Sequence, residues 1–187
     1  AYNVYYGEGR DLYDVAGRVA HEAIFNVNDG NFRCPSTQQG YSPFTTWTRG
    51  LAWILSGYAE QLEFLATCTD PELVEHEGRE RNEQIMRRAA MATADFYLDN
   101  TPTDGIPYWD SGAPGLVHLG DYLDRPAEPA NAHEPVDSSA AAIAAQGFLR
   151  LGHYLSAEDR ERADRYRAAG LTILDRLLES TYLATDA

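Results

Sequence analysis

The sequence predicts an all-α fold in which helical hairpins form part of a ring. Helical periodicity is found almost everywhere after residue 43. The four helical segments alternate between being apolar on nearly all sides and being apolar on one face only. A helix that is apolar all round must be covered on most sides, whereas an amphipathic helix can face water. We therefore expect the first kind inside the ring and the second kind outside.

Length and composition agree with one globular domain. The chain has 187 residues, of which 44% are hydrophobic and 24% are charged, as in ordinary soluble domains. A formal net charge of −14 argues against the clustered Lys and Arg of a nucleic-acid-binding surface and against adhesion to anionic membranes. No apolar stretch approaches the roughly 20 residues that a membrane helix needs. We expect neither a nucleic acid nor a membrane as partner.

The two cysteines, Cys34 and Cys68, match no metal-binding or redox spacing and are expected to be free thiols. The sequence contains no phosphate-binding loop and no nucleophile elbow, so no cofactor and no metal are expected. Composition leaves the compartment open, with the cytoplasm and the periplasm as candidates. It leaves the oligomeric state open as well, with a homodimer as one candidate.

A short β-hairpin is expected ahead of the first helix, near residues 21–33. Apolar residues flank the Asp29-Gly30 pair on both sides, and Asp-Gly between such runs is typical of a hairpin turn. The polar stretch PSTQQGYSPF follows. We expect exposed polar side chains in this region.

The first two helices are expected over residues 43–67 and 71–98. Ser42 followed by Pro43 is a typical N-cap and first helical position. The first helix is apolar nearly all round. Asp70 precedes the second helix, whose charges lie early and mostly on one face. Together they predict one buried helix and one amphipathic helix.

The third and fourth helices repeat this order after a loop rich in Pro, Gly and Asp. Asp137 is expected to cap the third helix, over residues 138–155, which is again apolar nearly all round. Ser156 with Asp159 resembles a capping box for the fourth, over residues 157–183, which is amphipathic. The repeat predicts two consecutive hairpins of the same kind.

Two hairpins cannot close a ring. A toroid of six hairpins would need on the order of 350 residues, given helices of about 20 residues and connections of about six or more. The chain is therefore predicted to be part of a larger barrel. The alternative is a small four-helix bundle, in which only two partners would cover the helices that are apolar all round.

Arg49 stands near the start of a helix that otherwise looks built for a core. A cation there faces the positive end of the helix dipole, at a cost of about 0.3–1 kcal/mol unless something offsets it. An anionic ligand at the helix end would offset it, and so would a structural Asp or Glu elsewhere in the barrel. Both explanations remain open.

Four further residues are candidates for a site near Arg49. Trp53, four residues later, shares its helix face and is either a stacking surface for a sugar or a core residue. His21 and Gln39 precede the helix and are either polar ligand contacts or ordinary surface residues. Asp110, in IPYWDSGAP, is either a catalytic carboxylate or, as is commoner before Ser-Gly, a turn former.

Three motifs in a fixed order resemble one enzyme family. The segments TTWTRGLAWILSGYA, GIPYWDSGAP and PVDSSAAAIAAQGFLRLG, with the STQQGY loop ahead of them, are similar to the unsaturated glucuronyl hydrolases, glycoside hydrolase family 88. The resemblance covers residues from about 18 to 183. It implies an (α/α)6 barrel, of which residues 1–187 would be the C-terminal part of a single domain. It also implies a site at the N-terminal ends of the inner helices.

The resemblance further implies a reaction and a set of site residues. These enzymes remove 4,5-unsaturated uronic acid from lyase-generated oligosaccharides by hydrating the C4=C5 double bond, with an Asp as general acid and base. His21, Gln39, Arg49 and Trp53 match the family's substrate-binding positions, and His21 is also an auxiliary catalytic candidate. The general acid/base Asp is expected upstream of this stretch, where nothing here matches it, so the chain alone is expected to be inactive.

Two departures from the family pattern concern the neighbouring subsite. Gln38 stands where members often have His, and Leu51 replaces the usual Gln, so the sugar accepted there is undetermined. Two other functions remain as alternatives. One is an unsaturated rhamnogalacturonyl hydrolase, similar to family 105, and the other is a non-catalytic helical module that binds acidic sugars.

Overall fold

The computed structural model describes residues 3–74, 76 and 78–183 of the chain. This part is largely helical, with one small β-hairpin at its N-terminal side. Its elements in chain order are β1 (Glu22–Phe25), β2 (Phe32–Ser36), α1 (Thr48–Leu65), α2 (Asp70–Val74), α3 (Gly78–Asp99), the 3-10 helices η1 (Pro114–Leu119) and η2 (Tyr122–Asp124), α4 (Ser138–Leu155) and α5 (Arg160–Leu177).

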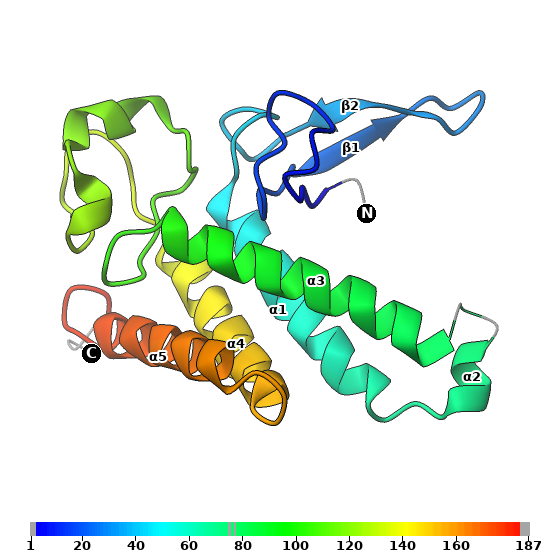
Figure 1. Cartoon of the computed structure of the whole chain (residues 1–187). Helices are drawn as coiled ribbons and strands as arrows, with labels where there is room; N and C mark the ends of the chain where they lie inside the picture. The colour runs from blue at the N-terminus through cyan, green and yellow to red at the C-terminus, as the bar shows by residue number, and fades with distance from the viewer. Residues whose placement is uncertain (1–2, 75, 77, 184–187) are drawn as a thin grey trace.

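The long helices form two layers. Helix α1 packs against both α3 and α4, and α4 also packs against α5. Figure 1 shows α1 and α4 running side by side from the same end of the molecule, with α3 and α5 on their outer side. The predicted alternation of inner and outer helices is confirmed, and the chain forms an arc of an α/α barrel.

The two inner helices approach each other closely at Gly147. A Cβ atom there would lie 2.8 Å from Cγ of Leu55 and 2.9 Å from the backbone nitrogen of Ser56, distances at which something must shift. Phe148 and Leu151, just beyond this contact, are fully buried. A residue without a side chain is thus what lets α1 and α4 share one core.

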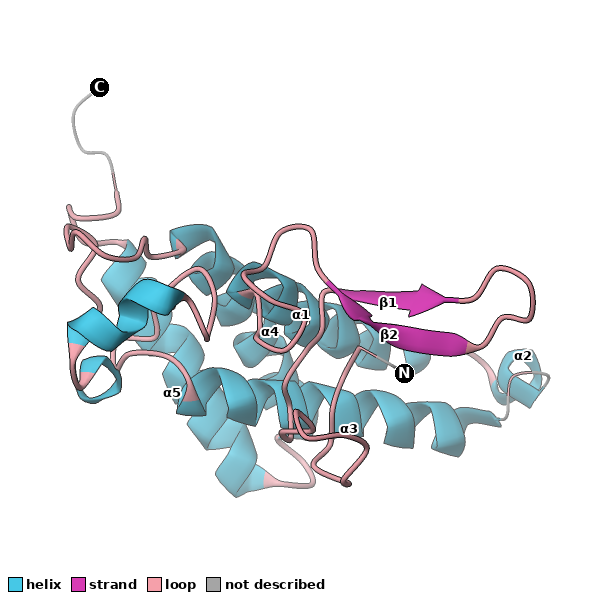
Figure 2. Ribbon diagram, turned by 90° about the horizontal axis from the view of Figure 1, so that it is seen from above, coloured by secondary structure: helices cyan, strands magenta, loops and turns pink. Residues whose placement is uncertain are grey.

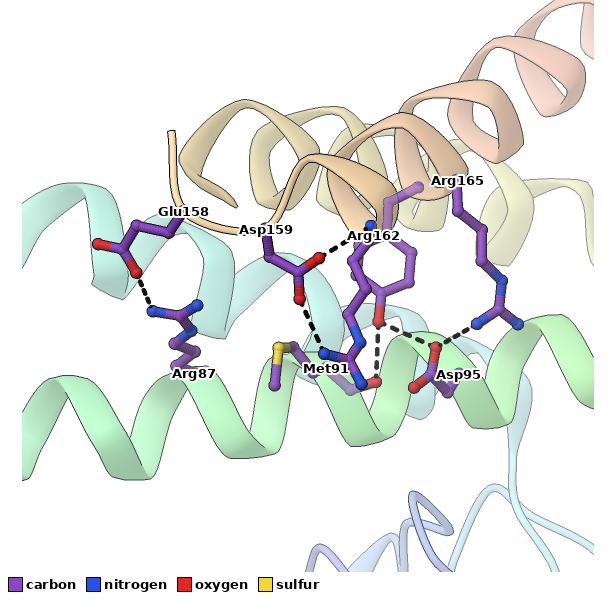
Figure 3. A network of polar contacts seen from close by, with 8 residues as sticks. Arg87, Met91, Asp95, Glu158, Asp159, Arg162 and Arg165 are labelled. Atoms are coloured by element: carbon purple, nitrogen blue, oxygen red, sulfur yellow. Dashed lines mark hydrogen bonds and ion pairs between the residues drawn. The ribbon is translucent and has the colours of Figure 1, made fainter. Parts of the chain in front are cut away.

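Outer helices α3 and α5 are joined by polar side chains (Figure 3). Arg87 of α3 pairs with Glu158, which lies just before α5. Asp95 of α3 accepts hydrogen bonds from Arg165 Nη1 and from the hydroxyl of Tyr166, both at 2.9 Å. Tyr166 is fully buried, so this contact anchors α5 on α3 at the core boundary.

One face of α1 is left uncovered in the described chain. Trp53 is 58% exposed and Phe64 is 60% exposed, although α1 was predicted to be buried on most sides. An arc covers a barrel helix only on the sides where its neighbours are present, which accounts for the open face. A closed four-helix bundle would have covered these aromatic rings, so the structure supports the partial barrel.

The predicted start of the first helix is wrong. Helix α1 begins at Thr48, five residues after Pro43, and its N-cap is Trp47 without a side-chain capping bond. The preceding residues instead form tertiary contacts, because Trp47 makes an isolated β-bridge with Asp110 and Thr46 N donates to Ser111 Oγ at 3.0 Å. Ser42 is therefore not the cap.

The second predicted helix is two helices in the structure. Helix α2 ends at Val74, and α3 begins at Gly78, whose φ of +80° is easily reached only by glycine. Glu75 and Glu77 lie outside the described residues. The prediction of one continuous helix missed this break.

The ends of the fourth helix also differ from the prediction. Ser156 is the C-cap of α4, and Asp159 is the N-cap of α5, accepting a hydrogen bond from Arg162 N at 3.2 Å. Helix α5 ends at Leu177, before the stretch at 180–182, whose Ser, Thr and Tyr are weaker helix formers than Leu or Arg. The capping site was predicted three residues too early.

The β-hairpin is present as predicted. Strands β1 and β2 pair antiparallel, and Gly30 in the connection has a φ of +71°. Figure 2, which looks down on the end where α1 and α4 begin, shows the hairpin on one side and the loop between α3 and α4 on the other. No helix within the described residues has the length and apolarity required to cross a bilayer.

Candidate functional site

Arg49 and Asp137 lie at the starts of the two inner helices and form an ion pair. Both Nε and Nη2 of Arg49 are 3.0 Å from Oδ2 of Asp137. The carboxylate offsets the unfavourable position of a cation in the first turn of α1. The sequence left open whether an anionic ligand or a structural acidic residue offsets the charge of Arg49, and the structure shows a structural acidic residue, Asp137.

The ion pair leaves Arg49 accessible. The Arg49 side chain is 45% exposed, whereas that of Asp137 is only 5% exposed. Within the described residues, no hydrogen bond is found at Nη1 of Arg49. Asp137 is further fixed because its Oδ1 accepts from Ala140 N at 2.9 Å and from Ser139 Oγ at 2.8 Å. A buried carboxylate thus orients a half-exposed guanidinium that can bind an anion on its open side.

His21 lies at the base of the hairpin, facing the loop that follows β2. Its Nδ1 is 3.3 Å from Thr37 Oγ1, and it accepts from the backbone N–H groups of Gln38 at 3.2 Å and Gln39 at 3.4 Å. The fold therefore brings His21 and Gln39 together, although 18 residues separate them in sequence. Gln39 itself is exposed.

Trp47 lies between His21 and Arg49. Its ring centroid is 4.9 Å from that of His21, and the guanidinium carbon of Arg49 is 5.9 Å from the Trp47 ring centroid. Sequence reasoning left Trp47 out of the candidate set. The signal that could have identified Trp47 was its position two residues before Arg49 in the segment TTWTRGLAWILSGYA. These three side chains form a continuous row at the start of α1.

Asp110 is a structural residue. It is fully buried, and its carboxylate accepts from Tyr41 N at 2.8 Å and from Gly112 N at 2.9 Å. The first bond holds the loop between β2 and α1 against the loop between α3 and α4, and the second forms the turn. Of the two roles left open for Asp110, the structure favours the turn former.

Trp53 lies one helical turn after Arg49 on the open face of α1. It borders a shallow hollow of about 190 Å³, together with Ile54, Gly57, Tyr58 and Gln61. Its exposed ring offers the apolar face that stacking on a sugar requires. A larger hollow of about 360 Å³, between the end of α3 and α5, shares no residue with this site.

The four candidate residues supply complementary chemistry at one end of the arc. Arg49 provides a positive charge, His21 and Gln39 provide polar groups, and Trp53 provides an apolar surface. The carboxylates of Asp110 and Asp137 are already engaged by backbone N–H groups and, for Asp137, by Arg49. Among the described residues, no group of three or more His, Cys, Asp or Glu side chains is placed to hold a metal ion.

The fold defines the class of protein, an α/α barrel built from helical hairpins, of which this chain forms an arc. No family model matches the chain. An unsaturated glucuronyl hydrolase from Bacillus sp. (strain GL1) is 31% identical over 153 residues, which cover 82% of this chain and 32% of the relative. A second, from Formosa agariphila, is 26% identical over 170 residues, covering 90% of this chain and 33% of the relative.

Structural comparison gives the same result. The crystal structure of the unsaturated glucuronyl hydrolase from Bacillus sp. GL1 superposes with a TM-score of 0.63 and 28% identity, covering 87% of this chain and 34% of that one. By sequence and fold the chain is similar to the unsaturated glucuronyl hydrolases. It spans about one third of the length of the curated relatives that it matches.

Proposed function

We propose that the protein containing this chain removes 4,5-unsaturated uronic acid from the ends of lyase-generated oligosaccharides. The observation that carries the proposal is the 31% identity to an unsaturated glucuronyl hydrolase over 82% of the chain. The arrangement at the start of α1 supports it, because an accessible cation beside exposed polar and aromatic side chains suits an acidic sugar.

The proposed roles follow from the side chains. Arg49, held by Asp137, binds the uronate carboxylate or an oxygen beside it. Trp53 stacks on the face of a sugar ring, and its exposure leaves that face available. His21 and Gln39 contact ring hydroxyl groups or the carboxylate from the hairpin side.

The proposed reaction is hydration of the C4=C5 double bond. A general acid delivers a proton to C4, water adds at C5, and the resulting hemiketal opens and releases the next sugar. Such a step requires one carboxyl group that alternates between acid and base. We propose that this Asp lies outside the 187 residues, because Asp110 and Asp137 are buried and engaged in structural contacts.

Absorbance of the conjugated double bond provides the test. The product of the full open reading frame that carries this chain is incubated with chondroitin-, ulvan- and pectin-derived unsaturated disaccharides. We expect the absorbance to fall. We expect Arg49→Ala to raise KM by about tenfold or more, with a smaller effect on kcat, because the substitution removes a contact that binds the substrate. Arg160→Ala is the matched control, because Arg160 is 89% exposed on the outer helix α5.

Each other outcome has a definite meaning. Turnover restricted to pectin-derived substrates that carry rhamnose would favour a rhamnogalacturonyl hydrolase. Saturable binding without any loss of absorbance would favour a non-catalytic module. Neither binding nor turnover with any of the three substrates would leave Arg49 as a structural cation and reject the proposal.

A further inference from the structure

We infer that residues 37–39 fix the tautomer of His21, with the proton of the neutral imidazole on Nε2, so that His21 offers substrate a hydrogen-bond donor and does not act as a base. The tautomer follows from the geometry of this chain alone. The contact with substrate rests on the proposed function. Thr37 is the positioning residue in this arrangement.

Three groups converge on Nδ1 of His21. Two are the backbone N–H groups of Gln38 and Gln39, at 3.2 and 3.4 Å, and a backbone N–H can only donate. The third is the Thr37 hydroxyl at 3.3 Å. Its oxygen already accepts from Gly40 N at 2.8 Å, which leaves its own proton available for Nδ1. Each of the three groups is therefore able to donate to this nitrogen.

The other tautomer loses these bonds. A proton on Nδ1 would point at the N–H groups of Gln38 and Gln39 and would leave Thr37 as the only acceptor. Each neutral hydrogen bond lost shifts the population by roughly two- to tenfold. The Nδ1–H form thus loses two hydrogen bonds and keeps one, and this difference favours the Nε2–H form.

The proton on Nε2 of His21 is then the one that can be donated to a substrate. Within the described residues, Nε2 of His21 makes no hydrogen bond, and the ring packs against Trp47 at a centroid distance of 4.9 Å. Because Trp47 also contacts Arg49, the Nε2–H donor and the guanidinium belong to one row of side chains. A nitrogen that already carries a proton cannot remove another, so His21 binds and does not deprotonate.

The tautomer is tested by NMR on the ¹⁵N-labelled protein. Long-range ¹H–¹⁵N correlations of the imidazole ring distinguish a protonated from an unprotonated nitrogen, and the spectrum of His21→Gln assigns the signals by their loss. At a pH where the ring is neutral we expect protonated Nε2 and unprotonated Nδ1. A protonated Nδ1, or comparable amounts of both forms, would overturn the inference.

Kinetics with an unsaturated uronyl disaccharide test the donor role. The amide of Gln reaches the place of Nε2, whereas that of Asn reaches the place of Nδ1. We expect His21→Gln to keep kcat/KM within about tenfold of wild type, since one charge-assisted hydrogen bond is retained, and His21→Asn to lose considerably more. Equal activity of the two variants, or better activity of His21→Asn, would refute the donor role.

Thr37 is tested by a matched pair. Thr37→Val should raise KM about three- to tenfold, because the ring loses one of the groups that orient it, and Thr37→Ser should restore KM. The Nε2–H form should persist in both variants, because the N–H groups of Gln38 and Gln39 still face Nδ1. An unchanged KM in Thr37→Val would remove Thr37 from the inference, a shift to the Nδ1–H form would contradict the role of the two N–H groups, and circular dichroism identifies any variant that fails to fold. If wild type shows the Nε2–H form but no turnover, the proposed function fails while the tautomer assignment stands.

Discussion

Asp137 joins the two inner helices by dividing its carboxylate between them. Its Oδ1 accepts from Ala140 N at 2.9 Å and caps α4, while its Oδ2 binds Arg49 of α1 through two N–H groups at 3.0 Å. One buried residue thus caps the N-terminus of α4 and positions the exposed cation of α1. The cap and the cation belong to a single structural unit.

The substitution Asp137→Asn distinguishes the capping of α4 from the ion pair with Arg49. Asn is as good an N-cap as Asp, but it cannot neutralise Arg49. We expect a loss of about 1 kcal/mol in the free energy of unfolding and a raised KM, because the guanidinium loses its fixed direction. Asp137→Ala should cost about 0.5–2 kcal/mol more, since the cap is lost too. Urea denaturation and steady-state kinetics measure both, and equal stability of the two variants would contradict this division.

Gly147→Ala should destabilise the protein by about 1–3 kcal/mol, because its Cβ would press on Leu55 and Ser56 of α1. The control is Gly57→Ala on α1, where a Cβ would meet nothing within 4 Å. There alanine should be neutral or stabilising by up to about 1 kcal/mol, through its higher helix propensity. Thermal unfolding followed by circular dichroism compares the two. Similar melting temperatures would show that the inner helices are not in such close contact.

Tyr166 should make stability depend on pH in the alkaline range. Burial, followed by the charge of Asp95, raises the pKa of Tyr166 above its usual value of 10.0. A raised pKa in the folded state means that the stabilisation is complete below about pH 10 and is lost as the pH rises further. We expect Tyr166→Phe to cost about 1 kcal/mol at neutral pH, and the difference to shrink above pH 10. A constant difference between the two proteins in urea denaturation from pH 7 to 11 would contradict this.

Asp14 should make the N-terminal loop sensitive to acid. Its carboxylate accepts from the backbone N–H groups of Tyr6, Gly7, Glu8 and Arg10 at 2.8–3.2 Å, and these bonds, led by that of Arg10, lower its pKa below 3.8. A lowered pKa in the folded state means that the stabilisation is present above about pH 4 and is lost as the pH falls.

Hydrogen exchange checks this prediction. Protection factors of the amides of residues 6, 7, 8 and 10 should decrease between pH 5 and the acid end of the titration, while those of α4 persist. Asp14→Ala should show low protection of the same amides at both pH values. Loop protection that does not change with pH in wild type would contradict the assigned role of the carboxylate.

Much of the fold could be predicted because its signals are local. Periodicity within one helical turn identified α1 and α4 as inner helices, and an Asp-Gly turn identified the hairpin. The cap at Asp137 was found because it bonds a residue only three positions away. The start of α1 was missed, since the bridge between Trp47 and Asp110 joins residues far apart in sequence and replaces a local helix signal.

The candidate site divides in the same way. The sequence by itself determined that Arg49 and Trp53 share one face of α1, because a spacing of four residues fixes this in any α-helix. Only the tertiary structure decided that Arg49 pairs with Asp137, 88 residues away, and that Trp47 lies between Arg49 and His21. Contacts of this range depend on the path of the loop between α3 and α4 and of the hairpin, which no short spacing in the sequence encodes.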